Sequence, residues 1–469
     1  MRIVGSIFLA AAATIVGGCG GANVAAGTTS TSGGDMAFGG PGSGGPDSGL
    51  PPGGDDHADG GVPGSLGDGG IFIPPIGDMG TVQHAPPGTL SGVTVLGAGT
   101  DFRDVSTDQG HGVWATTSST VYYFHGGAVS TYTTANGLAQ GQSTWTSNYW
   151  CGPGVGSPSC PQTWNTTFTS VAGGMPGQVV VGHIGYSVSR LDVDPTSGAV
   201  RDIVGVTVTS TQQPDPTEMT EQQEREVASW KVVVDLAGTY GGTAYFGGWH
   251  GTSALHNLSA SRTTGVCGDG CGDYEEHQHG FFNGDTQPGG RDVHALAITK
   301  EGDLWMGDAD VISFVAQRSV GPYENLMSTG ASIPGQPGAS ALDVFPGVAD
   351  NTYGLALDAN EGIYVASYGN GLAYLAPGTY APTYWSMSDK LPQNYLTGVV
   401  VDPAGDVWIA TGSAGVVRYQ PSSATWVYYT TASGLPSNDI RSIYLDQYAS
   451  SGRTIYLATD NGIAAYSGD

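Results

Sequence analysis

The chain has 469 residues, of which 78 are glycine, and its 41 Asp and Glu outnumber its 14 Lys and Arg to give a formal net charge of −27 at pH 7. So few cations exclude a nucleic-acid-binding protein, because phosphate recognition needs a basic patch. The same charge excludes attachment to anionic lipid headgroups by electrostatic attraction. The length suits two or three ordinary domains or one large repeat domain.

The N-terminus has the pattern of an export signal. Ile3 to Val16 is an apolar, Ala-rich run that is too short to cross a bilayer. It ends in Val16-Gly17-Gly18-Cys19, which resembles the bacterial lipobox: an aliphatic residue, two small residues and the cysteine that receives the lipid. The resemblance implies that residues 1–18 are a signal peptide and that Cys19 is the lipidated first residue of an exported lipoprotein.

The residue after this cysteine bears on localisation. Gly20 stands where some bacteria place an aspartate for inner-membrane retention, so we expect a lipid anchor in the cell envelope at the outer membrane. An ordinary secretory signal with an incidental cysteine is the alternative.

Residues 19–88 have the composition of a disordered tether. Gly, Pro, Ser, Asp and Ala dominate, and no Lys or Arg occurs between Arg2 and Arg103. Low hydrophobicity and charge of one sign cannot offset the entropy lost on ordering. We expect this stretch to hold a folded domain away from the membrane. The apolar island at 71–76 either docks onto that domain or stays unstructured.

Four short β-type runs recur through the last third of the chain. One unit comprises 397–401, 407–411, 415–419 and 425–429, and the next begins at 440–445. The first run is almost entirely apolar, as expected for a strand buried on both faces. The sequence Asp402-Pro403-Ala404-Gly405 predicts a tight turn into the second run. Four strands in a period of about 40–50 residues predict one blade of a β-propeller.

The same register runs back to residue 103. Earlier units begin at 103–107, 168–172, 230–234, 294–298 and 353–357, which makes seven units in all. The last unit ends after three strands, and residues 92–97 form one additional predicted strand ahead of the first unit. We therefore predict an all-β fold over residues 89–469: a seven-bladed β-propeller of four-stranded blades, closed by an N-terminal strand that completes the last blade.

The repeat residues resemble those of the two-component regulator propeller family. The family motifs are approximated by Gly434-Leu435-Pro436-Ser437-Asn438 and by Val407-Trp408-Ile409-Ala410-Thr411. Residues 351–469 match well, 101–138 and 291–310 match in part, and 139–290 match poorly. The resemblance implies a propeller that senses extracellular signals, often carbohydrate in gut-bacterial regulators. The sequence has no recognisable transmembrane helix, kinase or DNA-binding region, so we expect only the fold and a binding role to carry over.

Candidate binding residues come from two register positions that we expect at the propeller mouth. Ligands of propellers usually meet the loops between blades and the ends of the inner strands. Aromatic rings with convergent polar groups suit a sugar or peptide, whereas the alternative is a solvated rim around a water-filled channel. The inner strands open with Arg103, Phe168, Trp230, His294, Tyr353 and Arg441 among others, and His183, Trp249, His250 and Asp308 lie at or beside the ends of second strands.

Three insertions interrupt the repeat, near 141–164, 211–226 and 262–290. Cys151 with Cys160 and Cys267 with Cys271 form two close pairs, which predict two short disulfides in an exported chain. Free buried thiols are the alternative. Residues 215–226 have the pattern of a short exposed helix.

The third insertion also carries candidate metal ligands. His277 and His279 would face the same side of a strand, with Glu275 nearby. These residues could bind Zn²⁺ or Ca²⁺. The alternative is a solvated acidic loop held by a disulfide, in a protein without a cofactor.

Two functional hypotheses follow. The first is a non-catalytic binding or scaffold lipoprotein, held at the membrane by its lipid and presenting the propeller to a glycan, peptide or protein. The alternative is an enzyme, because propellers with similar Trp-containing repeats include lyases of the virginiamycin B lyase type, which use a funnel histidine and a metal. That resemblance makes His183, His250 and His294 the acid/base candidates, each of which would need a carboxylate or metal within hydrogen-bond reach.

Overall fold

The computed structural model describes residues 80–138, 167–184, 187–207, 229–237, 241–248, 251–256, 258, 274–275, 293–308, 311–315, 332–337, 339, 341–348, 351–449 and 453–468. Of Glu275 only the backbone is described. Several sequence predictions lie outside these residues: the signal peptide, Cys19, the island at 71–76, both cysteine pairs, Trp249, His250, His277, His279 and the helix at 215–226.

The described strands form seven antiparallel sheets of four strands each. The first three sheets contain β2 (Asp104–Thr107), β3 (Val113–Thr116), β4 (Val121–His125) and β5 (Ala128–Tyr132); β6 (Thr167–Gly173), β7 (Gln178–Ile184), β8 (Ser187–Val193) and β9 (Val200–Thr207); and β10 (Ser229–Asp235), β11 (Thr243–Gly248), β12 (Gly251–His256) and β13 (Tyr274–Glu275).

The fourth, fifth and sixth sheets follow in chain order. They contain β14 (Ala295–Ile298), β15 (Leu304–Gly307), β16 (Ile312–Val315) and β17 (Ala341–Leu342); β18 (Thr352–Leu357), β19 (Ile363–Ser367), β20 (Gly371–Leu375) and β21 (Pro382–Trp385); and β22 (Leu396–Val401), β23 (Val407–Thr411), β24 (Val416–Gln420) and β25 (Thr425–Tyr429). The last sheet contains β26 (Ile440–Leu445), β27 (Ile455–Thr459), β28 (Gly462–Tyr466) and β1 (Val93–Leu96). Two 3₁₀ turns, η1 (Thr134–Asn136) and η3 (Thr431–Ser433), follow β5 and β25.

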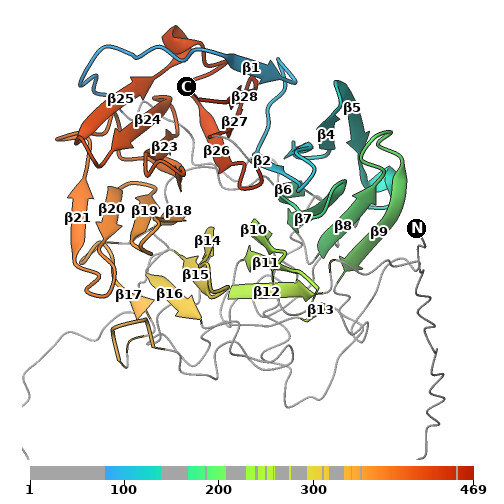
Figure 1. The fold of residues 1–469 in the computed structure, drawn as a ribbon, viewed down its shortest axis with the longest axis horizontal. Coiled ribbons are helices and arrows are strands. Elements are labelled where there is room, and N and C mark those ends of the chain that lie inside the picture. The colour runs from blue at the N-terminus through green and yellow to red at the C-terminus, as the bar shows by residue number, and fades with distance from the viewer. Residues whose placement is uncertain are drawn as a thin grey trace, which may run out of the picture. The chain divides into compact units, whose positions relative to one another are not determined.

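The first strand of each sheet lies beside the first strand of the next. In order, β2, β6, β10, β14, β18, β22 and β26 are neighbours, and β26 is in turn a neighbour of β2. Figure 1 shows the sheets set around a common axis with these strands nearest to it. Glycine permits the close approach, since a Cβ on Gly354 would lie 2.8 Å from the Cα of Gly398. The prediction of an all-β fold built from four-stranded sheets is confirmed, and the arrangement is that of a β-propeller.

The turn between the first and second strands explains the repeating Asp-x-x-Gly motif. The Asp402 carboxylate accepts hydrogen bonds from the backbone N–H of Ala404 (2.9 Å) and Asp406 (3.1 Å) and from Nε1 of Trp408 (2.9 Å). Gly405 takes the left-handed conformation that the turn requires, with φ of 82°. Such carboxylates are occupied by the turn itself, which accounts for the motif without a bound cation.

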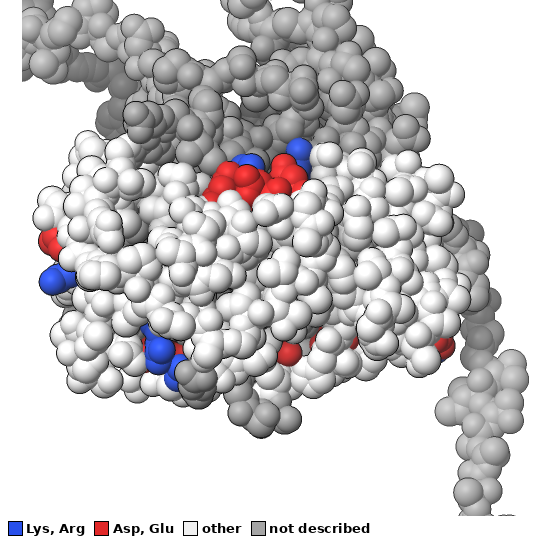
Figure 2. Space-filling view, turned by 90° about the horizontal axis from the view of Figure 1, so that it is seen from above, with Lys and Arg blue, Asp and Glu red and all other residues white. Residues whose placement is uncertain are grey.

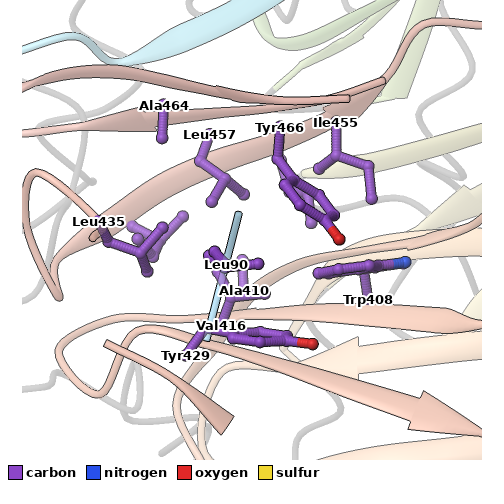
Figure 3. Packing of buried hydrophobic residues seen from close by; sticks show 12 residues of the cluster. Leu90, Trp408, Ala410, Val416, Tyr429, Leu435, Ile455, Leu457, Ala464 and Tyr466 are labelled. Atoms are coloured by element: carbon purple, nitrogen blue, oxygen red, sulfur yellow. The ribbon is translucent and has the colours of Figure 1, made fainter. Parts of the chain in front are cut away.

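Apolar side chains fill the space between neighbouring sheets. Between the sixth and last sheets, Trp408 and Tyr429 pack with Leu457 and Tyr466. Figure 3 shows Leu90, from the segment before β1, in the middle of this cluster. The N-terminal segment therefore contributes to the core as well as to the last sheet.

Residues 82–88, at the end of the predicted tether, make hydrogen bonds to the propeller. The backbone N–H of Val82 donates to Pro392 O, and that of Gly88 donates to Tyr428 O, both at 2.8 Å. His84 Nε2 lies 2.8 Å from Leu391 O. Carbonyl groups of β25 and of the connection between the fifth and sixth sheets thus give residues 82–88 hydrogen-bond partners, which composition alone does not reveal.

The third of the predicted insertions forms part of a sheet. β13 lies inside the predicted insertion at 262–290, so that insertion supplies the outer strand of the third sheet. Among the described residues, no helix is long and apolar enough to cross a membrane.

Candidate ligand-binding site

A β-bulge recurs where the inner strand of a sheet begins. In five sheets, one residue of the inner strand has no partner in the second strand. A bulge of this kind changes the direction in which the side chain of the unpaired residue points. The skipped residues are Thr169, Trp230, Tyr353, Thr397 and Arg441. Thr169 replaces Phe168, which the sequence register had suggested for the second sheet; Phe168 is paired with His183.

The two remaining sheets place a residue at the same point without a bulge. Arg103 precedes β2 and its backbone N–H donates to Thr116 O at 2.7 Å, while His294 precedes β14 and donates to Gly307 O at 3.0 Å. We call the ring formed by these seven positions the mouth. It contains Arg103, Trp230, His294, Tyr353 and Arg441, five of the nine binding residues expected from the sequence.

Aromatic rings are in continuous contact along one side of the mouth. The ring centroids lie 5.3 Å apart for Trp230 and His294, and 4.6 Å apart for His294 and Tyr353, which are parallel within 8°. Tyr353 then contacts Tyr368, and Tyr368 contacts Tyr395, both at 5.1 Å. All five side chains are half-buried. We call these residues the aromatic arc, and they span the third to the sixth sheets.

The aromatic arc is uncharged near neutral pH. Burial lowers the pKa of His294 to about 4, so its imidazole is neutral. Burial, followed by the proximity of Tyr395, raises the pKa of Tyr368 to about 12, so its hydroxyl stays protonated. The arc therefore offers ring faces, hydroxyl groups and a neutral imidazole to a ligand.

The opposite side of the mouth carries charges. Arg441 Nη2 lies 3.2 Å from Asp439 Oδ2, and Arg441 Nε lies 3.7 Å from Asp101 Oδ1. Burial lowers the pKa of Arg103. The charge of Asp101 acts in the opposite direction, and the charge of Arg441 lowers this pKa further. Burial raises the pKa of Asp439 to about 6, against the opposing effect of Arg441. Elsewhere charge is sparse: Figure 2 shows one side of the molecule with most described residues uncharged and the acidic ones gathered mainly in one patch.

Two of the expected mouth residues are buried below it. His183 is 1% exposed, its ring lies edge-on to Phe168 at 4.9 Å, and neither ring nitrogen has a hydrogen-bond partner. Burial lowers its pKa to about 3. Asp308 is 2% exposed and its carboxylate accepts the Val311 backbone N–H at 2.7 Å, so it serves a turn. Trp249 and His250 lie outside the described residues.

These positions bear on the enzyme hypothesis. His183 has no carboxylate within hydrogen-bond reach, and His294 is held between Trp230 and Tyr353. Within the described part of the chain, no group of three His, Cys, Asp or Glu side chains is placed to hold a metal ion. His250, the third acid/base candidate, lies outside the described residues.

Four residues beside the mouth were not predicted from the sequence. Tyr368 follows β19 and Tyr395 precedes β22, and an isolated β-bridge joins them. Tyr368 lies one residue after the register position at Ser367 and Tyr395 lies two residues before the one at Thr397, so a wider window would have found both. Asp101 and Asp439 each stand two residues before an arginine of the mouth, and this repeated Asp-x-Arg spacing was the available signal.

Comparisons with known proteins give fold-level likenesses only. No protein-family model matches the sequence, and no curated protein sequence matches it significantly. Among solved structures, the extracellular domain of BT4673 from B. thetaiotaomicron is 12% identical, with a TM-score of 0.46 over 81% of this chain and 39% of that one. Virginiamycin B lyase from Staphylococcus aureus is 11% identical, with a TM-score of 0.48 over 80% and 99%. The WD40 β-propeller domain of Doa1 is 11% identical, with a TM-score of 0.45 over 81% and 97%. The chain thus spans about two-fifths of the length of the BT4673 domain that it resembles.

Proposed function

We propose that this chain is an envelope-anchored, non-catalytic lipoprotein whose propeller mouth binds a glycan. The observation that carries the proposal is the aromatic arc, in which five half-buried rings from four sheets are in continuous contact. An extended row of rings with polar edges is a surface that folding alone does not require, because the apolar cores lie between the sheets.

The chemistry of the arc suits a carbohydrate. A sugar presents apolar C–H faces for stacking and hydroxyl groups for hydrogen bonds, and Tyr and Trp offer both kinds of contact. Nε1 of Trp230 has no hydrogen-bond partner in the structure, and the imidazole of His294 is neutral. A ligand with alternating apolar and hydroxylated surfaces would satisfy these groups without bringing charge to the arc.

The proposal includes the complete architecture of the domain. It treats the seven sheets as seven blades and β1 as the strand that completes the last one. The supporting observation is the antiparallel pairing of Val93–Leu96 with Tyr466–Ile463. With its ends joined in one sheet, the ring would keep the mouth residues in fixed relative positions, which reduces the entropy lost when a ligand binds.

A glycan array probed with the full-length protein tests the binding function. We expect binding of a carbohydrate, followed by a loss of about 10-fold or more in affinity for Tyr353→Ala and for Trp230→Ala, measured by calorimetry. Tyr419→Ala is the matched control, because Tyr419 is also half-buried and stacks on Trp426 at 4.3 Å, but on the outer strands of the sixth sheet. No carbohydrate binding, or binding that both mouth variants retain, would contradict the proposal.

The anchor is tested separately. Metabolic labelling with a radioactive fatty acid should mark the wild-type protein in its native host, and Cys19→Ser should abolish the label and release the protein from the membrane fraction. A labelled Cys19→Ser protein would exclude lipidation at this cysteine while leaving the binding function open.

A further inference from the structure

A second groove lies away from the mouth, at the turn end of the first sheet. Its volume is about 510 Å³, and it is lined by the β2–β3 turn, by the β4–β5 hairpin and by β1 of the last sheet. Val95, Phe124 and Val129 supply apolar surface, and Val129 is 54% exposed. Among the described residues that line it, none is Asp, Glu, Lys or Arg. A pocket of this size and character suits a small uncharged molecule.

One histidine of the groove is held by a buried carboxylate. His111 Nδ1 lies 3.0 Å from Asp446 Oδ2, where the His111 side chain is 50% exposed and that of Asp446 only 4%. The other oxygen of Asp446 accepts hydrogen bonds from Thr107 Oγ1 (2.9 Å) and the Tyr448 backbone N–H (3.0 Å). With Nδ1–H donated to Asp446, the Nε2 atom of the neutral imidazole is a hydrogen-bond acceptor. The carboxylate thus fixes both the orientation and the tautomer of His111.

A second histidine of the groove has an unused nitrogen. His125 is 7% exposed, and its Nε2 lies 3.1 Å from Ser130 Oγ. Its Nδ1 is buried without a hydrogen-bond partner. Buried polar atoms without partners are uncommon, because desolvation of an unpaired group is unfavourable. His125 contributes a buried wall to the groove, beside the more exposed His111.

The backbone at His111 is strained in a way that folding does not require. His111 has φ of 62°, a left-handed conformation that favours glycine. The equivalent turn position is Gly302 in the fourth sheet and Gly405 in the sixth, with φ of 87° and 82°. The fifth sheet has Glu361 there, with φ of 65°. Glycine would fold this turn without strain, so the first sheet retains a histidine against a conformational penalty.

We infer that this groove is a ligand site separate from the mouth, and that it takes a small molecule with a flat apolar body and one O–H or N–H donor, as in a phenol. The body lies against Val95, Phe124 and Val129. The donor binds Nε2 of His111, which Asp446 orients. The uncharged lining disfavours an ionic ligand, and the acceptor distinguishes a phenol from the corresponding ether.

A matched pair of fluorinated probes tests the inference with the full-length protein. Titrations of 4-fluorophenol and 4-fluoroanisole are followed by ¹⁹F NMR, since the two differ only in the donor hydrogen and the methyl group that replaces it. We expect 4-fluorophenol to bind about 10-fold more tightly, the effect of one hydrogen bond to an oriented acceptor. His111→Gly should remove that difference by weakening the phenol alone. Val129→Asp should weaken both probes, because it places a charge on the apolar wall.

The control uses the same backbone position in another sheet. Glu361→Gly removes a side chain from the equivalent left-handed turn and should leave both titrations unchanged. His111→Gly should fold, because two other sheets carry glycine at this point, and its melting temperature checks that directly. Equal affinities for the two probes, no binding of either, or an undiminished phenol preference in His111→Gly would overturn the inference.

Discussion

The two ends of the inner strands differ in what their side chains do. At the end where the inner strand turns into the second strand, the Asp402 carboxylate accepts hydrogen bonds from two backbone N–H groups and from the Trp408 side chain. At the opposite end, a bulge leaves Tyr353 and Arg441 outside the ladder of paired residues. Tyr353 there stacks on His294 of the fourth sheet, and Arg441 forms ion pairs with Asp439 and Asp101. One repeat therefore supplies stability at its turn end and a variable side chain at its mouth end.

The largest expected effect comes from a substitution in the turn that follows an inner strand. Asp402→Ala should lower the free energy of unfolding by about 3–5 kcal/mol, since it leaves the Trp408 N–H and the Arg453 guanidinium, 2.8 Å away, without their buried partner. Urea denaturation measures the loss. Asp402→Asn keeps an acceptor for the turn and should lose less. A loss below about 1 kcal/mol for the alanine variant would show that water replaces these hydrogen bonds.

The next prediction concerns acid sensitivity below the mouth. His183 has a pKa of about 3 when folded and about 6.5 when unfolded, so the folded state disfavours its protonation. Its neutral form is fully compatible with folding above pH 6.5, and stability is lost as the pH falls from there toward 3, by at most about 1.4 kcal/mol per pH unit.

The matching variant removes this titration. His183→Leu should lose about 2 kcal/mol less than the wild type between pH 6.5 and pH 5, measured as the shift in the urea midpoint. Identical shifts in the two proteins would mean that another group dominates the acid response. His294→Leu is a useful companion, because the pKa of His294 is lowered for the same reason, to about 4.

The sequence predicted the repeating elements more fully than the site. β-branched runs and Asp-x-x-Gly turns are local signals, so strands such as Val407–Thr411 were located to the residue. The mouth was predicted only in part, because a bulge shifts the register by one residue: Thr169 took the place expected for Phe168, and Tyr368 and Tyr395 fell just outside the window. The burial of His183 depends on how neighbouring sheets pack, which a single strand does not encode.

The charged side of the mouth should make the free energy of unfolding depend on pH in the direction opposite to that of His183. Burial raises the pKa of Asp439 to about 6, above its value in the unfolded chain, so the folded state favours the protonated carboxyl. Stability from this group is therefore present at low pH and is lost as the pH rises through about 4 to 6. Asp439→Asn should abolish that decline, with a smaller amplitude than at His183 because the Asp439 side chain is 17% exposed and paired with Arg441.

Titration by NMR separates this effect from that of the neighbouring acids. The Asp439 carboxyl signal should shift with a midpoint near pH 6, whereas Asp439→Asn removes the signal and Asp101→Asn lowers the midpoint, because Asp101 disfavours ionisation of Asp439. A midpoint near 4 in the wild type would show that Arg441 compensates fully for burial.

The smallest expected effect concerns backbone strain at the turn end of the inner strands. Glu361 and Gly405 occupy the same left-handed position, with φ of 65° and 82°, and nothing lies within 4 Å of a Cβ placed on Gly405. Conformation dominates the difference, because Glu361→Gly also removes one long hydrogen bond, from the Lys300 backbone N–H to the Glu361 carboxylate at 3.4 Å. Glu361→Gly should therefore stabilise the protein by about 0.5 kcal/mol, and Gly405→Ala should destabilise it by about 1–2 kcal/mol. His111→Gly also relieves strain but forfeits the contact with Asp446, so its net change should fall below that of Glu361→Gly. If His111→Gly stabilised the protein as much as Glu361→Gly does, the histidine–aspartate contact would contribute nothing to folding.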